Sequence, residues 1–205
     1  MPMTARITRR PTRFVAHLLP FALVGCGTDG PTDPDAFLSG IDPVGADGTC
    51  VVQNETFDDD VIVPRDAECE FTDVKIQGNL KLDRGARLTA TRLEVDGNLQ
   101  AQRAALAVVE DSEILGDLQF EQGGSVDLRR SRLDGNLQLE DNDGALTALD
   151  SVIEGDLQAF QNRSGPFLFS DNTIDGNLQC KENAPAPQGS GNIVGGNRED
   201  QCEGF

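Results

Sequence analysis

Gly97-Asn98-Leu99-Gln100 is one of six closely similar tetrads that recur along this chain of 205 residues. The others begin at Gly78, Gly116, Gly135, Gly155 and Gly176, and the phase extends back to Asp59-Asp60-Val61 and forward to Gly196-Asn197. Successive copies start 19 to 21 residues apart. A steady period of this length is typical of solenoid proteins, in which each repeat forms one supersecondary unit. The sequence therefore predicts one stack of similar coils over residues 40–205.

Apolar and polar residues alternate after the glycine of each tetrad, as in Leu137-Gln138-Leu139. A period of two indicates a β-strand with every second side chain facing the core. A further alternation follows in mid-repeat, as at Val126 and Leu128. Strands this short bury their apolar sides only if the repeats stack about 4.8 Å apart. The predicted fold class is all-β, a parallel β-helix of about seven coils that is on the order of 35 Å long.

The second residue of the tetrad forms a column of amides and carboxylates in which no two aspartates are neighbours. Its members are Asp60, Asn79, Asn98, Asp117, Asn136, Asp156, Asn177 and Asn197. Stacked carboxylates repel, whereas an amide between them can donate to both, so this order predicts a hydrogen-bonded ladder. Alternatively, Gly-Asn and Gly-Asp are corner dipeptides that tolerate positive φ. A shared metal ion is disfavoured, because Asp117 and Asp156 would stand roughly 9–10 Å apart.

Two further columns are expected on the outside of the stack. Glutamines fill the fourth position of five tetrads and form a candidate binding face for a glycan or a protein: Gln100, Gln119, Gln138, Gln158 and Gln179. Charges alternate at another matching position, through Arg92, Asp111, Arg130 and Asp150, so each is expected to meet its opposite above and below. Arg129, Arg130 and Arg132 suggest a site for an anionic sugar or phosphate as an alternative, although the neighbouring acidic residues favour ion pairs within the stack.

The first 25 residues differ in character from the repeats. Four arginines precede an apolar run from Phe14 to Gly25, which is typical of an export signal and short for a membrane span. The run ends in Leu23-Val24-Gly25-Cys26, which resembles the lipobox of bacterial lipoproteins. The resemblance implies a signal peptide at residues 1–25, an acylated Cys26 and an exported protein anchored by lipid to a membrane of the bacterial cell envelope.

Two features of the next residues refine this prediction. Gly27 follows the cysteine where an aspartate would signal inner-membrane retention, so the resemblance implies the outer membrane. Residues 26–39 are rich in glycine, proline and aspartate and contain few apolar residues, a composition that predicts a flexible acidic tether between lipid and coils.

Four cysteines remain after Cys26, and export favours their pairing in disulfides. With the period projected back to Gly40, Cys50 and Cys69 share the eleventh position of successive coils. Cα atoms stacked about 4.8 Å apart lie within the range that a disulfide can bridge. Cys180 and Cys202 likewise lie in the last two coils. We therefore expect one disulfide at each end of the stack.

The recurring Gly-Asn/Asp-Leu over residues 59–180 resembles the coils of bactofilins, and it is similar to small exported bacterial β-helix proteins of unassigned activity. The resemblance to bactofilins implies a right-handed β-helix. The export signal, the cysteine pairs and the prolines near the carboxyl terminus depart from the polymer-forming bactofilin pattern. We expect the irregular segments 51–58 and 184–195 to cover the two ends and to leave a monomer.

Charge and composition narrow the function. Removal of residues 1–25 takes away four arginines and the only histidine, leaving 13 basic and 35 acidic residues and a net charge of −22. Nucleic acid is then an unsuitable partner. No catalytic residue, metal site or cofactor is predicted, and weak calcium binding by the acidic residues 58–60 or 140–143 is a less favoured alternative. The leading hypothesis is a non-enzymatic envelope rod or scaffold. The alternatives are a binding module for a glycan or protein and, less favoured, a polysaccharide-active enzyme.

Overall fold

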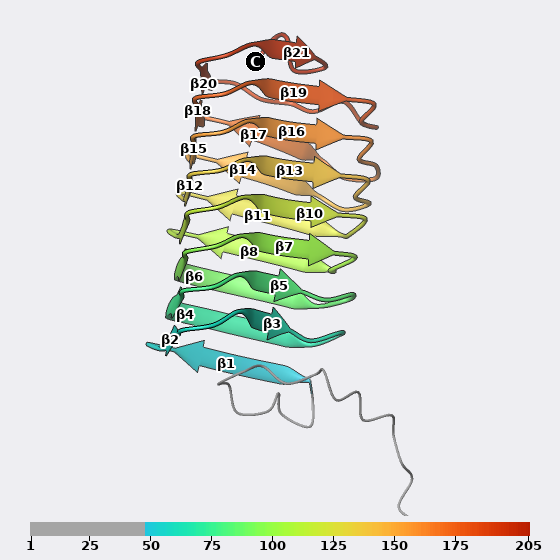
Figure 1. Cartoon of the computed structure of the whole chain (residues 1–205). Coiled ribbons are helices and arrows are strands. Elements are labelled where there is room, and N and C mark those ends of the chain that lie inside the picture. Colours follow the sequence, from blue (N-terminus) through green and yellow to red (C-terminus); the bar gives the residue numbers. More distant parts are fainter. Residues whose placement is uncertain (1–47) are drawn as a thin grey trace, which may run out of the picture. The chain divides into compact units, whose positions relative to one another are not determined.

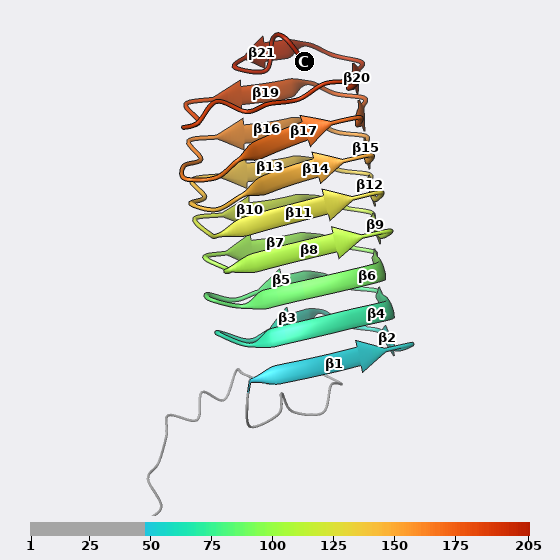
Figure 2. The same ribbon diagram turned by 180° about the vertical axis from the view of Figure 1, so that it is seen from behind.

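The structure is a computed structural model that describes residues 48–205. Strands are the only regular elements of these residues, and they form a parallel β-helix (Figure 1). In Figure 1 the front strands run to the right as the chain climbs from the amino-terminal coil, and Figure 2 shows the opposite strands also running to the right from behind. This winding is right-handed, as predicted. The predicted signal peptide, Cys26 and the tether lie outside the described residues.

One face of the β-helix is a sheet of eight parallel strands, which we call the glutamine face. Its strands begin two residues after each tetrad glycine or, for β3, after the equivalent Asp59. They are β3 (Val61–Val63), β5 (Leu80–Leu82), β7 (Leu99–Gln102), β10 (Leu118–Glu121), β13 (Leu137–Glu140), β16 (Leu157–Phe160), β19 (Leu178–Lys181) and β21 (Arg198–Asp200). Eight strands give about eight turns, close to the seven expected from the repeats.

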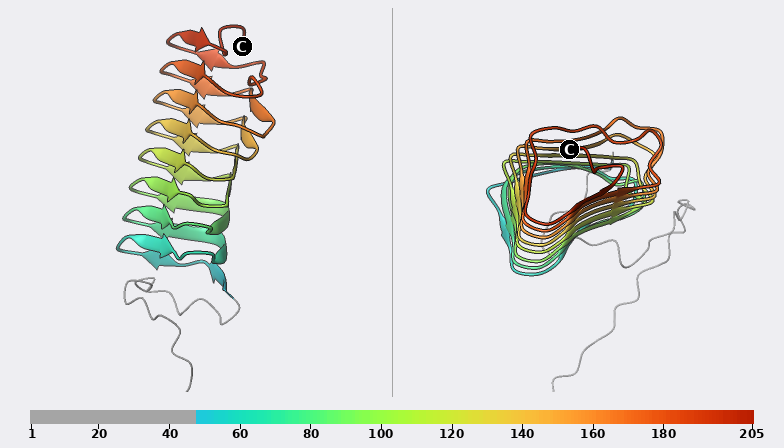
Figure 3. Two further views of the ribbon diagram at one scale, coloured as in Figure 1. Left: turned by 90° about the vertical axis from the view of Figure 1, so that its right-hand side faces the viewer. Right: turned by 90° about the horizontal axis from the view of Figure 1, so that it is seen from above.

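A sheet of 13 strands makes the other two sides. The long-strand face holds β1 (Thr49–Gln53), the first parts of β4 (Glu68–Ile76) and β6 (Arg87–Val95), β8 (Leu106–Glu110), β11 (Ser125–Arg129), β14 (Leu146–Leu149) and β17 (Phe167–Ser170). The short-strand face holds β2 (Thr56–Phe57), the last parts of β4 and β6, β9 (Glu113–Ile114), β12 (Arg132–Leu133), β15 (Val152–Ile153), β18 (Thr173–Ile174) and β20 (Ile193–Val194). Seen from above, the coils superimpose as a rounded triangle (Figure 3).

The core is a set of apolar columns. Leu99, Leu118 and Leu137 pair in register on neighbouring strands, and all three side chains are fully buried. The period of the tetrads thus translates directly into stacking, because each repeat places the same leucine over its copy.

Coils lengthen at the corner between the glutamine face and the long-strand face, which we call the insertion corner. Phe120 pairs in register with Leu139 on the glutamine face, and Val126 pairs with Leu146 on the long-strand face. The chain from Val126 to Leu146 is one residue longer than the chain from Phe120 to Leu139, so the extra residue lies at the corner between the two faces. The next coil adds another residue before Phe167. Confining extra residues to one corner keeps both sheets in phase.

Both expected disulfides are present. Cys50 and Cys69 are neighbours on β1 and β4 with Cα atoms 4.5 Å apart, and the Cα atoms of Cys180 and Cys202 are 5.3 Å apart. All four side chains are buried. Each bond ties a terminal coil to its neighbour. The disulfides are typical of an oxidising, exported environment.

The predicted irregular end covers are wrong. Residues 51–58 contain the end of β1 and all of β2, and Val52 and Phe57 alternate with exposed residues and point into the core. Residues 184–195 continue the last full coil, through a bridge between Leu168 and Gln188 and through β20. The carboxyl-terminal end is covered instead by the turn after β21, where Phe205 packs against the core.

Candidate functional site

The predicted column of amides and carboxylates runs along the corner between the short-strand face and the glutamine face, and we call it the outer ladder. Each backbone N–H donates to the side-chain Oδ1 of the residue one coil before it: Asn98 to Asn79 at 2.9 Å, Asp117 to Asn98 at 2.8 Å and Asn136 to Asp117 at 2.7 Å. The same bond recurs at Asn79, Asp156, Asn177 and Asn197. The ladder is therefore continuous over eight coils.

Two details of the prediction are corrected. The asparagines donate in one direction only: Asn136 Nδ2 donates to Asp117, 3.0 Å away, while its Oδ1 accepts the backbone N–H of Asp156. The alternative based on positive φ is also wrong, because no member of the outer ladder and no tetrad glycine has a positive φ. The glycine is needed for space instead. A Cβ on Gly97 would lie 2.6 Å from Asn79 Oδ1 and 2.8 Å from the carbonyl oxygen of Gly78.

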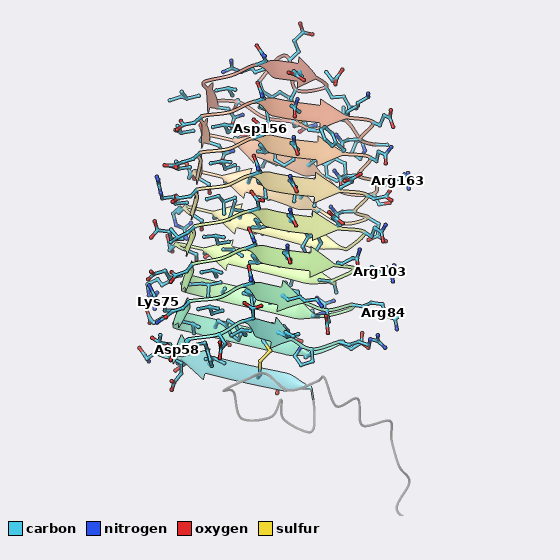
Figure 4. All side chains as sticks on the ribbon, viewed as in Figure 1. Asp58, Lys75, Arg84, Arg103, Asp156 and Arg163 are labelled. Atoms are coloured by element: carbon cyan, nitrogen blue, oxygen red, sulfur yellow. A yellow bond between two sulfur atoms is a disulfide. The ribbon has the colours of Figure 1, made fainter. Side chains whose placement is uncertain are left out.

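The predicted glutamine row forms one column on the outside of the glutamine face, in register from Gln100 to Gln179. Gln100 Nε2 donates to Gln119 Oε1 at 3.3 Å, and Gln158 Nε2 donates to Gln179 Oε1 at 3.0 Å. The row continues to Glu199, which accepts a 2.8 Å bond from Gln179. Its amides are exposed or half-buried and repeat at one strand spacing. Figure 4 shows side chains projecting outward from every coil of the stack.

Two buried polar ladders were not predicted. The serine ladder lies between the long-strand and short-strand faces: the backbone N–H of Ser112 donates to Ser131 Oγ at 3.1 Å, that of Ser131 to Ser151 Oγ at 3.2 Å, and the column continues through Asn172 and Asn192. In contrast to the outer ladder, each acceptor comes from the following coil.

The asparagine ladder lies at the insertion corner and is built in the same sense. Its members are Asn142, Asn162, Asn183 and Gln201, joined by bonds of 2.8 to 3.1 Å. Their side-chain amides also donate to carbonyl oxygens of the core strands, for instance Asn162 Nδ2 to Leu139 at 2.9 Å. Asn142 and Asn162 lie where the coils lengthen, yet both side chains point inward and are buried.

The residue that precedes each buried ladder position lies in the left-handed region of φ. At the serine ladder these residues include Asp111, Arg130, Asp150 and Asp171, with φ of 47 to 58°, and at the asparagine ladder they are Asp141, Gln161, Glu182 and Asp200, with φ of 55 to 58°. This conformation turns the chain so that one side chain points outward and the next points inward. A charged or polar residue followed by Ser or Asn recurs at both corners of the sequence, but this pair does not show that the second side chain points inward.

The predicted column of alternating charges pairs downward only. Arg130 Nε and Nη2 donate to Asp111 at 2.7 and 3.0 Å, and Arg92 Nη2 donates to Asp73 Oδ2 at 2.7 Å. Asp150 makes no ion pair in the described residues. These hydrogen bonds lower the pKa of Asp111 and Asp73 and raise the pKa of Arg130 and Arg92.

This charged column forms one wall of a shallow groove of about 560 Å³, whose floor includes Ser112 and Ser131. Arg132 on the other wall bonds to Glu154 and lies 2.9 Å from Asp134, and Arg129 donates to Asp127 at 2.7 Å. Every arginine that the sequence offered as an anion site is thus paired with a carboxylate. The groove's donors and acceptors are largely engaged with one another.

Among residues 48–205, no three His, Cys, Asp or Glu side chains gather in a way that could hold a metal ion. The same residues include no helix able to cross a membrane. The acidic residues outside the ladders follow columns rather than forming a cluster. For example, Asp96, Asp134 and Asp175 each directly precede a tetrad glycine.

Comparisons of the chain with protein-family models, curated proteins and solved structures gave no significant match. The class of protein, a parallel β-helix with hydrogen-bonded ladders between its coils, therefore follows from the structure alone.

Proposed function

We propose that the protein is a non-enzymatic rod or scaffold of the bacterial envelope, anchored to the outer membrane by lipid on Cys26. The observation that carries this proposal is the outer ladder, which joins all eight coils, together with a disulfide at each end. The serine ladder from Ser112 and the asparagine ladder from Asn142 add buried side-chain bonds between the coils toward the carboxyl-terminal end. Such a stack resists bending and suits a passive, length-defining role.

The anchoring part of the proposal rests on the lipobox-like Leu23-Val24-Gly25-Cys26 and is supported by the buried disulfides, which suit an exported protein. Acyl chains add about 0.8 kcal/mol of membrane affinity for each buried CH₂, so two or more chains anchor a protein durably. The acidic composition of the chain disfavours nucleic acid as a partner. We propose that the rod is a monomer, because its carboxyl-terminal end is covered by its own last turn.

Acylation is tested by growing cells with an alkyne fatty acid and comparing the natural chain with Cys26→Ala. The expected result is label in the membrane fraction for the natural protein, and an unlabelled, soluble protein for the variant. Labelling that survives in Cys26→Ala would remove the basis for the anchor.

The rod is tested separately by changing its length. Deletion of residues 97–115 removes one whole repeat and joins Asp96 to Gly116, so every ladder stays in phase. In the purified protein, a dye at the carboxyl terminus should move about 4.8 Å closer to a dye at the exposed Gln53 of the first coil, a distance that does not include the tether. Duplication of the same residues should move it away by the same step. Energy transfer that does not follow the number of coils would contradict a rigid spacer, whatever the result for Cys26.

A further inference from the structure

Phe160 is an aromatic side chain on the outside of the glutamine face. It ends β16 and is in register with Gln102, Glu121, Glu140 and Lys181, which are all polar. The other phenylalanines in strands of the described residues, such as Phe120 and Phe169, are buried in the core. Phe160 keeps part of its surface in solvent, although hydrophobic burial would favour the interior for a ring of this size.

The ring lies in a recess of about 320 Å³ that is lined by Glu140, Phe160, Gln161, Lys181 and Glu182. This volume is at the lower end of the range for sites that hold small molecules. Gln161 Nε2 donates to Glu182 Oε2 at 3.0 Å, which fixes one wall at the insertion corner. The other walls come from the coils directly below and above the ring.

Glu140 below the ring and Lys181 above it are exposed, and within residues 48–205 neither forms an ion pair. These two unpaired charges differ from the charged residues of the groove described above, where Arg130 is paired with Asp111 and Arg132 with Asp134. The recess thus combines an apolar disc with a free carboxylate on one side and a free ammonium on the other. A purely apolar ligand would strip water from both charges without replacing it.

We infer that this recess binds one ring of a polysaccharide. A pyranose has an apolar face of C–H groups that can lie on Phe160, and hydroxyls around its edge that can donate to Glu140 and accept from Lys181. Next to the recess, the amides of Gln138, Gln158 and Gln179 repeat at one strand spacing along the rod. They offer hydrogen bonds to further sugar units, which favours a polymer over a single sugar. This binding activity goes beyond the proposed role as a rod and does not depend on it.

The test uses the full-length lipoprotein in detergent micelles and three probes: cellotetraose, chitotetraose and tetragalacturonate. Binding is followed by amide NMR shifts and by titration calorimetry. We expect at least one probe to shift residues 158–161 and 179–182. Phe160→Gln should weaken that binding by about tenfold or more, the loss of one stacking contact. Because glutamine already occupies the equivalent outward position at residue 102, this variant is expected to fold normally.

The matched control is Leu168→Gln, which removes an exposed apolar side chain, 38% accessible, from the long-strand face. It should leave the affinity unchanged. The inference is overturned if none of the probes shifts these residues at millimolar concentration, or if both variants weaken binding equally. It is also overturned if the signals of residues 158–161 broaden with protein concentration alone and Phe160→Gln relieves the broadening, which would assign the recess to a protein partner.

Discussion

A single oxygen of Asn162 accepts both the backbone N–H and the side-chain Nδ2 of Asn142, each at 3.0 Å. The same side chain donates to the carbonyl oxygen of Leu139 and to Asn183 Oδ1, both at 2.9 Å. All of this occurs at a fully buried position. One amide therefore connects three coils, and its bonds cannot be replaced by water.

Asn162→Leu should lower the free energy of unfolding by roughly 2–5 kcal/mol, because it leaves several buried donors and acceptors unsatisfied. Urea unfolding measures the change. Asn98→Leu is the matched control in the partly exposed outer ladder, where water can replace the lost bond; a loss of only about 1 kcal/mol is expected there. Equal losses for the two variants would contradict the distinction between buried and outer ladders.

Gly97→Ala should destabilise the fold by about 1–3 kcal/mol, since the added methyl group would overlap backbone and ladder atoms of the previous coil. Gly204→Ala places the same methyl group in open space and should change stability little. The measurement is the thermal unfolding midpoint of both variants. If Gly97→Ala were as stable as Gly204→Ala, close coil approach would not explain the tetrad glycine.

Loss of the first disulfide through Cys50→Ala and Cys69→Ala should lower stability by about 3 kcal/mol, as expected for a closed loop of this size. Because coils contact mainly their neighbours, hydrogen exchange should accelerate first in β1 and β4. The pair Cys180→Ala and Cys202→Ala should instead loosen β19 and β21. Uniform acceleration along the whole stack in either variant would argue against local closure of the ends.

Gln122 has a φ of 54°, whereas Gln119 lies in the extended strand β10. Gln122→Gly should stabilise the protein slightly, by about 0.5 kcal/mol, because relief of the left-handed backbone exceeds the added freedom of the unfolded chain. Gln122→Val should be destabilising and Gln119→Val neutral or better, since β-branched residues suit strands only. Chemical unfolding of the three variants gives the comparison; a tolerated valine at position 122 would count against it.

The hydrogen bond from Arg130 holds the pKa of Asp111 below its ordinary value. A depressed folded-state pKa contributes stability above the unfolded value of about 4 and loses it as the pH falls through the folded value. Asp111→Asn should therefore reduce the loss of stability at acid pH and lower stability near neutrality. Unfolding midpoints measured from neutral to acid pH test this. An unchanged acid profile in the variant would mean that the pair contributes nothing measurable, as happens for some exposed pairs.

The sequence predicted what depends on long, regular repetition. Leu99, Leu118 and Leu137 stack because the same residue returns at a fixed interval, and the same counting places Cys50 over Cys69. The right-handed winding was predicted from the resemblance to bactofilins, because the repeat period alone does not distinguish a left-handed from a right-handed β-helix.

The buried ladders could not be found in this way. Ser131 and Asn142 are polar residues at corners, where turns and loops are also polar, and only their inward direction distinguishes them. That direction depends on the left-handed φ of the residue before each, which a sequence does not display. Phe160 differs: the alternation of Leu157 and Ala159 places it on the outside, but the recess around it depends on side chains from three coils and is not visible in the sequence pattern.

The opposite polarity of the ladders gives the stack a direction. In the outer ladder, the backbone N–H of each coil donates to a side-chain oxygen of the preceding coil. In the serine and asparagine ladders, each coil instead supplies the side-chain oxygen that accepts a backbone N–H of the preceding coil. Each arriving repeat therefore completes the one before it and prepares the site for the next. A chain that is synthesised from its amino terminus can consequently fold one coil at a time on the coils already formed. The stack ends at the turn that carries Cys202.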